Sequence, residues 1–431
     1  MNFSLKIKPL PVLVTATMVI TFMSGYSIFY GSVGSPLWYL LYYGKYFLIL
    51  FFVVISYSFH EPDKRFRKTR TWLYKLFLTL PLALLFYSFI VWLIRGSSVE
   101  FVSRGISSTL FRCIAYMGGI SIAYMFKKAA LKYGIYAAII TYSASVVLGL
   151  LKGGATFLKI NLMNRTTSIQ GLYTELHEVA FTIGLYLVFL FFINKRQYIS
   201  KTSLLTMLCI TYFIIGWKRI GIAGIIIVFL YGLFIHGRKN WTKSEVTKIT
   251  GIVAIIACLF YVSLSTSNEL VAILQLRGIN LMGRNIIYNY FRQFCDFHIN
   301  YFGRGVGFVT RQFDYATAAD LYNMISIKAL HNDLMKMFID IGFISYIFWC
   351  WYWLREVPQK IEKKIGTEAA FECFLLIMFS FITYTTDNTE GYFNFQLHLS
   401  MIMSVIIYNH IYINCEKITT KNNLEARIVV D

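Results

Sequence analysis

Long apolar runs alternate with short polar segments along almost the whole chain. The runs are about 17–22 residues long, which is the length that an α-helix needs to cross the roughly 30 Å hydrocarbon core of a bilayer. Polar and apolar residues do not alternate with a period of two, so the pattern argues against an outer-membrane barrel. The pattern predicts about twelve membrane-spanning helices, at residues 11–30, 37–57, 72–94, 106–126, 134–151, 178–193, 202–217, 220–236, 249–266, 334–354, 368–386 and 394–413.

The composition supports the same interpretation. The 431 residues are 57% hydrophobic and only 14% charged, whereas a soluble domain carries about 25% charged residues. The mean hydropathy is +0.58. We therefore expect an all-α polytopic integral membrane protein. Its net charge of +20 does not indicate a nucleic-acid partner, because lysine and arginine are concentrated in short loops, as the positive-inside rule expects.

The connecting segments form two alternating sets. One set is short and basic, so it is expected in the cytoplasm together with both termini; it comprises residues 63–70, 127–132, 194–201, 237–248 and 355–364. The other set is expected outside and comprises residues 31–36, 95–104, 152–177, 218–219, 267–333 and 386–394. We divide the chain into N-terminal helices (1–151), central helices with an outer loop (152–266), a large outer loop containing helices (267–333), and C-terminal helices with a cytoplasmic tail (334–431).

The outer segment 267–333 carries more positive charge than its expected side of the membrane favours. Charge bias normally places such a segment in the cytoplasm. Arginines kept outside against that bias need another role, and binding of an anionic substrate is the natural one. The segment contains Arg277, Arg284, Arg292, Arg304 and Arg311.

Other cations are candidates for the same role. Lys218 and Arg219 form a tight turn between two apolar runs, and Arg284 opens an amphipathic stretch. The alternative is that these side chains only reach lipid phosphates or solvent. Lys45 and Arg112 lie inside apolar runs, where a charged side chain either snorkels to the surface or lines a polar cavity.

His331, Asn332 and Asp333 stand at the start of the tenth expected span. Asp333, Lys336 and Asp340 share one face of that helix, and ionisable residues at this depth usually face a bundle interior or a wet cavity. We therefore expect His331 at the mouth of a polar groove. The alternative is a structural role, since a lone interfacial histidine is more often a hydrogen-bonding residue than a catalyst.

Two short motifs suggest cofactor or metal binding, but their surroundings do not support it. Residues 303–307 (GRGVG) follow no predicted strand and precede no Lys-Ser/Thr, so they do not form a nucleotide P-loop. Their glycines are expected to allow a sharp turn beside a ligand or another helix. His177 lies between Glu175 and Glu178, but no second histidine is near, so we expect no metal site and no cofactor.

Four segments, in order, resemble the O-antigen polymerase/O-antigen ligase superfamily of bacterial polysaccharide assembly. They are NRTTSIQGLYTELHEVAF (164–181), WKRIGIAGIII (217–227), MGRNIIYNYFRQF…GRGVGF (282–308) and HNDLMKMFIDIGFISYIFW (331–349). Met282 stands where the family usually has serine, and Asp340 stands where glutamate is commoner. The resemblance covers about residues 160–350, and the earlier residues match only as hydrophobic spans.

The resemblance implies a GT-C-like glycosyltransferase on the outer face of the bacterial cytoplasmic membrane. Its donor and acceptor would be undecaprenyl-pyrophosphate-linked oligosaccharides, and it would transfer the growing glycan to the next repeat unit. Arg219 and Arg284 would stabilise the pyrophosphate leaving group, and His331 would accept the proton of the acceptor hydroxyl. Substrate contacts are further expected from Arg165, Lys218, His177, Glu178, Arg304, Asn332 and Asp333.

Three other functions remain open from the sequence. A ligase that moves the polymer to another acceptor would share the fold and the chemistry. A flippase or transporter of lipid-linked oligosaccharide would also present cations to pyrophosphate, but on both halves of a pseudo-symmetric bundle. A membrane acyltransferase would place its histidine near a cytoplasmic donor, opposite to the expected side of His331. The polymerase function leaves room for a chain-length regulator protein as a partner.

Overall fold

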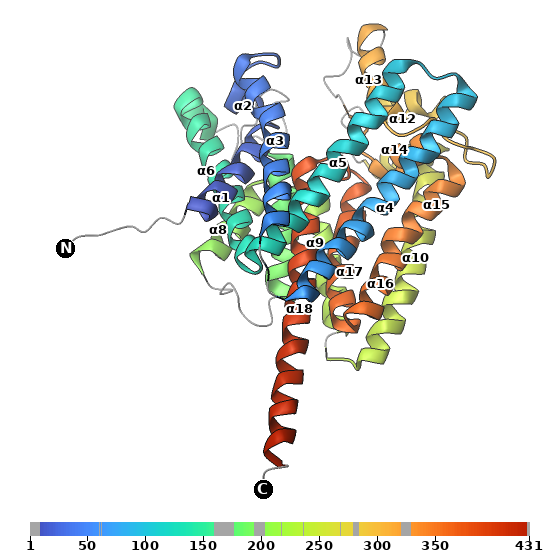
Figure 1. Ribbon diagram of the computed structural model, residues 1–431. Helices are drawn as coiled ribbons and strands as arrows, with labels where there is room; N and C mark the ends of the chain where they lie inside the picture. Colours follow the sequence, from blue (N-terminus) through green and yellow to red (C-terminus); the bar gives the residue numbers. More distant parts are fainter. Residues whose placement is uncertain are drawn as a thin grey trace.

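The computed structural model describes residues 9–59, 61, 63–158, 176–193, 203–216, 218–235, 237–267, 269–278, 284–319 and 329–428, with residues 153, 155–158 and 414–428 described by their backbone alone. Within these residues every regular element is a helix (Figure 1). The elements are α1 (Pro9–Met23), α2 (Ser27–Tyr30), α3 (Pro36–Ser58), α4 (Lys64–Arg95), α5 (Val99–Phe126), α6 (Ala129–Leu158), α7 (His177–Val188), η2 (Phe189–Ile193), α8 (Leu204–Gly216), α9 (Arg219–Ile235), α10 (Asn240–Thr266), α11 (Glu269–Leu276), α12 (Arg284–Arg292), α13 (Phe308–Ala319), α14 (Asp333–Ile341), α15 (Phe343–Trp351), η3 (Tyr352–Glu356), α16 (Val357–Lys364), α17 (Thr367–Tyr384) and α18 (Phe393–Ile428).

Of the described helices, six are long and apolar enough to cross a membrane, namely α3, α4, α5, α6, α10 and α17. Shorter apolar helices accompany them: α1, α7 continued by η2, α8 and α9. The protein is therefore an all-α membrane protein, as the hydrophobic pattern predicted. Each expected span also coincides with at least one described helix.

Two expected spans are each divided into shorter helices. The first, 11–30, breaks between α1 and α2. The tenth, 334–354, breaks at Gly342 between α14 and α15, where the backbone φ is 76°. A Cβ at Gly342 would lie 2.3 Å from the carbonyl carbon of Phe302, so glycine allows the chain before α13 to pack against this break. The expected single helix is thus replaced by two helices that meet at a turn.

The connections between helices sort by the end of the bundle at which they lie (Figure 1). The upper end in that view carries α2, α12, α13 and the turn between α4 and α5. The lower end carries the turn between α16 and α17 and the beginning of α10. Of these upper features, α12, α13 and the turn between α4 and α5 belong to connections expected outside, whereas α2 belongs to the first expected span. The lower features belong to the basic set. Charge pattern and fold therefore sort these connections in the same way.

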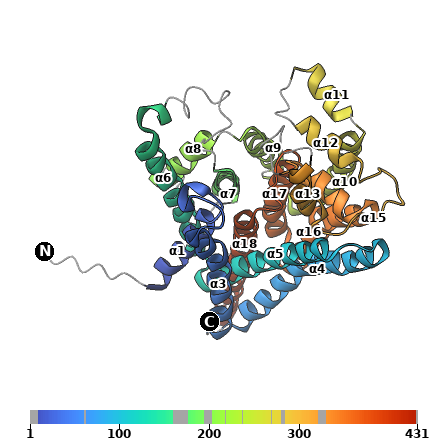
Figure 2. The same cartoon turned by 90° about the horizontal axis from the view of Figure 1, so that it is seen from above.

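The centre of the bundle is organised by the packing of α5 against α18. A Cβ at Gly119 of α5 would lie 2.2 Å from the Leu397 carbonyl oxygen and 2.2 Å from Ser400 Oγ. The absent side chain lets the two helices approach closely, as small residues do in membrane helix pairs. Seen from above, α17 and α18 lie between α6, α7 and α8 on one side and α10, α15 and α16 on the other (Figure 2). The connection from α17 to α18 is thereby held beside α5.

Candidate functional site

A cavity of about 600 Å³ opens at the end of the bundle that carries the connections expected outside. We call it the central cavity. It lies between α3, α5, the beginning of α7, α13, α14 and the connection from α17 to α18. Its charged lining residues are Lys45, Arg104, Arg112, His177, Glu178, Lys336 and Glu390.

One face of α5 forms a polar stripe along the central cavity. Lining residues recur there at intervals of three and four, which places them on a single side of the helix. The two arginines stand eight residues apart, with serines between them, on a helix long enough to cross a membrane. The stripe comprises Arg104, Ser107, Ser108, Phe111, Arg112 and Ala115.

Two buried carboxylates and two partly buried cations form a network in the wall of the central cavity. The Glu390 carboxylate lies 2.5 Å from an Arg112 guanidinium nitrogen and 3.6 Å from Lys336 Nζ. Lys336 Nζ also lies 3.9 Å from Asp333 Oδ1, and the Glu390 backbone N–H donates to Asp333 Oδ2 at 2.6 Å. Two cations therefore face two carboxylates. Such mutual neutralisation is what allows charges to be buried among helices.

His177 and Glu178 begin α7 and tie together three distant parts of the chain. Lys218 Nζ lies 3.3 Å from His177 Nε2. Glu178 Oε1 accepts a hydrogen bond from the Asn394 backbone N–H at 2.6 Å, and the Glu178 backbone N–H donates to Tyr26 Oη at 2.8 Å. The predicted loop-to-helix entry at His177 is therefore a junction that joins the beginnings of α2, α9 and α18 to the wall of the central cavity.

His331 stands at the rim of the central cavity, between Leu330, which lines it, and the cap of α14. Its φ is 49°, in the left-handed region, and its backbone N–H donates to Asn388 Oδ1 at 3.1 Å. Its Nδ1 lies 3.4 Å from Asn388 Nδ2 and 3.9 Å from Asp387 Oδ1. The second distance is too long for a direct hydrogen bond, so the carboxylate acts on the imidazole through its charge.

The charge of Asp387 interacts with both His331 and His177. Its Oδ1 accepts hydrogen bonds from Tyr392 Oη and from the Asn388 backbone N–H, both at 2.9 Å. Burial raises the pKa of this carboxyl, but the neighbouring His331 and the charges of His177 and Lys218 together hold the pKa well below its ordinary value. Asp387 is therefore an ionised carboxylate that faces groups from three different segments.

The other predicted site residues differ in how they are placed relative to Asp387 and the two histidines. Arg284 is the first residue of α12, and its charge acts on the hydroxyl of Tyr288, which in turn donates to the His331 carbonyl at 3.5 Å. In the 218–219 turn, Lys218 is buried at 9% exposure, whereas Arg219 is exposed. Arg165 lies outside the described residues.

Of the described residues predicted to bind substrate, Lys218, Arg304, Asn332 and Asp333 do not line the central cavity, and neither do the predicted catalytic residues Arg219, Arg284 and His331. Arg304 donates from Nε to the Phe294 carbonyl at 3.0 Å. Asn332 is fully buried and accepts from the Met335 backbone N–H at 2.9 Å, which caps α14. Asp333 is fully buried in the charge network. The described contacts of Arg304, Asn332 and Asp333 hold the protein together and position the groups that do face the cavity.

The glycine-rich segment at 303–307 is folded around Asp340. The backbone N–H groups of Gly307 and Val309 donate to the two carboxylate oxygens at 3.0 and 2.9 Å. Gly305 has a φ of 92°, and a Cβ there would lie 1.9 Å from Trp92 Nε1. The expected sharp turn beside another helix is therefore present, and the amide groups of Gly307 and Val309 are occupied by the protein itself.

Several residues of this site were missed in the sequence. The hydrophobic pattern places Asp387, Asn388 and Glu390 only in a connection expected outside, although two acidic residues so close together are a usable signal. Arg104 was also assigned to a loop, because the helix was expected to begin at residue 106, whereas α5 begins at Val99. With the correct start, the arginine and serine spacing would have indicated a polar helix face.

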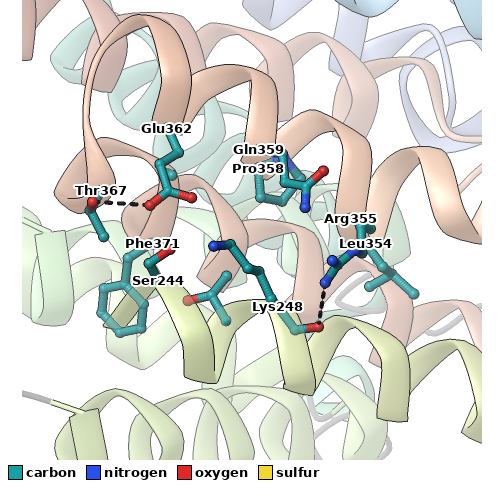
Figure 3. A pocket seen from close by; sticks show the side chains of 11 residues that line it. Ser244, Lys248, Leu354, Arg355, Pro358, Gln359, Glu362, Thr367 and Phe371 are labelled. Atoms are coloured by element: carbon teal, nitrogen blue, oxygen red, sulfur yellow. Dashed lines mark hydrogen bonds between the residues drawn. The ribbon is translucent and has the colours of Figure 1, made fainter. Parts of the chain in front are cut away.

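A second, much smaller cavity of about 10 Å³ lies at the other end of the bundle, between α10, η3, α16 and α17 (Figure 3). It has room for about one water molecule. Arg355 donates to the Lys248 carbonyl at 3.2 Å and Thr367 Oγ1 donates to Glu362 Oε1 at 3.1 Å. Its polar groups thus serve helix packing, and the central cavity is the candidate site.

The comparisons with known proteins leave the site to be interpreted from its own chemistry. No protein-family model matches the chain, and no curated protein matches it. Within the part of the chain that the structure describes, no three His, Cys, Asp or Glu side chains are grouped so as to hold a metal ion. The groups on hand are therefore cations, an imidazole beside an ionised carboxylate, and aromatic rings.

Proposed function

We propose that the protein is a membrane glycosyltransferase that polymerises undecaprenyl-pyrophosphate-linked oligosaccharide repeat units. The observation that carries this proposal is the pairing of His331 with the ionised Asp387 at the rim of a large cationic cavity. An imidazole beside a carboxylate is suited to accept a proton from a hydroxyl group. Fixed cations nearby are suited to a leaving group that gains negative charge.

The proposed setting is the bacterial cytoplasmic membrane, with the central cavity on the outer face and both termini in the cytoplasm. The basic connections at the opposite end of the bundle support this orientation. We propose that all twelve expected spans cross the bilayer, including those built from two short helices, in a GT-C-like arrangement. The lipid bilayer then brings the polyprenyl carriers to the cavity.

The reaction is a substitution at the anomeric carbon of the donor sugar. The acceptor hydroxyl oxygen forms the new glycosidic bond, and its proton passes to His331. The bond between the anomeric carbon and the pyrophosphate oxygen breaks, and undecaprenyl pyrophosphate leaves with the electron pair. Asp387 stabilises the positive charge that His331 gains, as a carboxylate does beside a catalytic imidazole.

The leaving pyrophosphate needs cations that keep their charge at every working pH. Guanidinium groups meet this need and can bind phosphate oxygens in pairs. We assign this role to Arg284, which lies next to the Tyr288 contact with His331, and to Arg219, which is exposed at the start of α9. Lys218, which contacts His177, adds a further positive charge beside Arg219.

A ligase that transfers the glycan to another acceptor would use the same groups and is the second candidate. The acceptor distinguishes the two, because a polymerase takes a second lipid-linked repeat unit. A flippase needs no proton acceptor, so the His331–Asp387 pair favours an enzyme. A chain-length regulator protein fits the polymerase as a partner.

The test uses purified protein in proteoliposomes that contain lipid-linked repeat units. Polymer should form with the natural protein, and the His331→Ala variant should be slower by about 100-fold or more, since general base catalysis contributes about 10²–10⁴ in rate. His298→Ala is the matched control, because His298 is exposed in the same outer segment. Polymer at the natural rate from His331→Ala protein would exclude this mechanism.

A further inference from the structure

The four strong cations of the central cavity are not equivalent. Arg112 and Lys336 are neutralised by Glu390 and Asp333. Lys45 and Arg104 line the same cavity, but neither forms an ion pair with a residue that the structure describes. Lys45 is only 6% exposed. Within the described residues, two positive charges thus face the cavity without a carboxylate at ion-pair distance.

Aromatic rings surround the Lys45 ammonium. Its nitrogen lies 4.7 Å from the ring centre of Tyr42, 4.9 Å from that of Tyr46 and 5.3 Å from that of Phe393. Ring faces stabilise a cation but accept none of its three N–H donors. The charge of Glu178 reaches Lys45 only over a longer distance, while Glu178 Oε1 is engaged by the Asn394 N–H. The ammonium therefore keeps donors for a ligand.

Arg104 approaches the same aromatic wall from α5. Its charge acts on the Tyr46 hydroxyl, and Tyr46 stacks on Phe111 with ring centres 4.2 Å apart. Arg104 Nε is buried and has no hydrogen-bond partner among the described residues. Arg104 lines the cavity and forms no ion pair with a described residue, so its guanidinium charge is available to an anionic ligand there.

The combination of cations and rings selects the class of ligand. A carboxylate matches the paired donors of a guanidinium. The negatively polarised face of an aromatic ring attracts the C–H groups of a sugar ring. A strongly hydrated pyrophosphate would gain nothing from the aromatic wall, whereas a pyranose ring with one carboxylate would use both features.

We propose that Lys45, Arg104, Tyr42, Tyr46 and Phe111 form a subsite for a sugar residue that carries a carboxylate, such as a uronic acid. This inference rests on the proposed function, because it assigns an acidic sugar to the repeat unit that is polymerised. The subsite lies on the cavity wall formed by α3 and α5, whereas His331 and Asp387 belong to the connections beside α14 and α18. One glycan can thus be held on one side and react on the other.

The test measures binding of soluble probes to the full-length protein in lipid nanodiscs by titration calorimetry. Trigalacturonate should bind, and its methyl ester, which has the same rings without the charges, should bind at least about tenfold more weakly. Lys45→Gln and Arg104→Gln should each weaken trigalacturonate binding by about 10- to 100-fold and leave binding of the ester unchanged. Lys132→Gln, at an exposed lysine of α6, should change neither.

Three outcomes would overturn the subsite. Equal binding of acid and ester would show that no carboxylate is recognised. If inorganic pyrophosphate displaces trigalacturonate, and Lys45→Gln weakens binding of both probes equally, the site is a pyrophosphate site instead. Unchanged trigalacturonate binding by both variants would exclude the two cations. Since Lys45 is deeply buried, thermal unfolding of each variant is recorded, and Arg104→Gln, at a partly buried position, carries the test if Lys45→Gln does not fold.

Failure of the subsite is distinguishable from failure of the proposed function, because soluble probes bind without turnover. If carboxylate selectivity holds but no lipid-linked repeat unit is polymerised, the subsite stands and the polymerase function fails. If the purified protein polymerises neutral repeat units as fast as acidic ones, the function stands and the subsite is excluded.

Discussion

The glycine-rich segment 303–309 and the connection 385–392 both fold against α14, at opposite ends of that helix. The first is bound at Asp340, whose backbone carbonyl accepts from the N–H groups of Arg304 and Gly305 at 3.0 and 2.7 Å and whose carboxylate accepts two more N–H groups. The second is bound at Asp333, which accepts the Glu390 N–H at 2.6 Å. An aspartate of α14 thus anchors each segment through backbone N–H groups.

The two segments differ in what remains after anchoring. The backbone N–H groups of residues 304–309 all donate to acceptors within the protein, and the Arg304 side chain donates to a backbone carbonyl. The connection 385–392 turns Asn388 and Glu390 toward the central cavity and Asp387 toward His331. The segment with the conspicuous motif thus has a structural role, and the segment without one carries the charges of the site.

The largest effect is expected from Gly305→Val. Its Cβ would lie 1.9 Å from Trp92 Nε1 at a φ of 92°, so the segment cannot close around Asp340 without moving a helix. We expect loss of folded protein, measured as the yield of monodisperse protein in detergent. Gly96→Ala is the control, because Gly96 also has a positive φ of 59° but meets nothing within 4 Å. It should cost only about 1–2 kcal/mol.

The next effect is expected on the other segment, from Glu390→Ala. Removal of this carboxylate leaves the largely enclosed Arg112 and Lys336 with only Asp333 as counter-charge. Breaking a buried ion pair costs about 3–5 kcal/mol, which chemical denaturation in detergent would measure. Glu356→Ala breaks the exposed pair with Lys360 and should cost less than about 1 kcal/mol. Equal stability of the two variants would contradict the network.

The fold was largely predictable, because hydrophobic length and loop charge act locally. Expected spans coincide with helices, and the connections sort to the expected ends. The break at Gly342 was not predictable, since it depends on the distant residue Phe302 packing against it. Helix starts were also misplaced, as at α5, because a polar residue in a cavity looks like a loop residue when only its type is known.

The site was predictable in part. His331, His177 and Lys218 were expected and do lie around Asp387. Asp387 itself was missed, because its importance comes from groups at positions more than 50 residues away. Arg304 was expected to bind substrate on its charge alone, and only the structure shows that its Nε faces the Phe294 carbonyl. Residue type indicates chemical capacity, whereas burial and partners decide its use.

A smaller effect on stability but a clear effect on rate is expected from Asp387→Asn. The change keeps the volume and removes the charge that acts on His331, so transfer should slow by about 100-fold, equivalent to about 2.7 kcal/mol. The measurement is the initial rate of polymer formation. Asp296→Asn, at an exposed aspartate between α12 and α13, should retain the natural rate. An unchanged rate for Asp387→Asn would separate the carboxylate from catalysis.

The same aspartate predicts a dependence of stability on pH. Its pKa in the folded protein is lower than its ordinary value, so its ionised form stabilises the fold. That contribution is complete above the ordinary aspartate pKa of about 3.9 and is lost as the pH falls toward the folded pKa. The stability of Asp387→Asn should therefore fall less steeply with decreasing pH than that of the natural protein. Acid unfolding followed by circular dichroism measures this dependence. Parallel acid profiles would contradict the assignment.

The smallest effect separates the two segments most cleanly. Arg304→Gln removes the Nε bond to the Phe294 carbonyl and the contacts with the Phe294 and Phe308 rings at 5.9 and 5.7 Å. We expect a loss of about 1 kcal/mol in unfolding free energy, with kcat and KM unchanged, because Arg304 does not line the central cavity. Arg304→Lys should recover part of the stability. A raised KM with unchanged stability would instead give Arg304 the substrate contact that the sequence suggested, and the glycine-rich segment would then share the role of the connection 385–392.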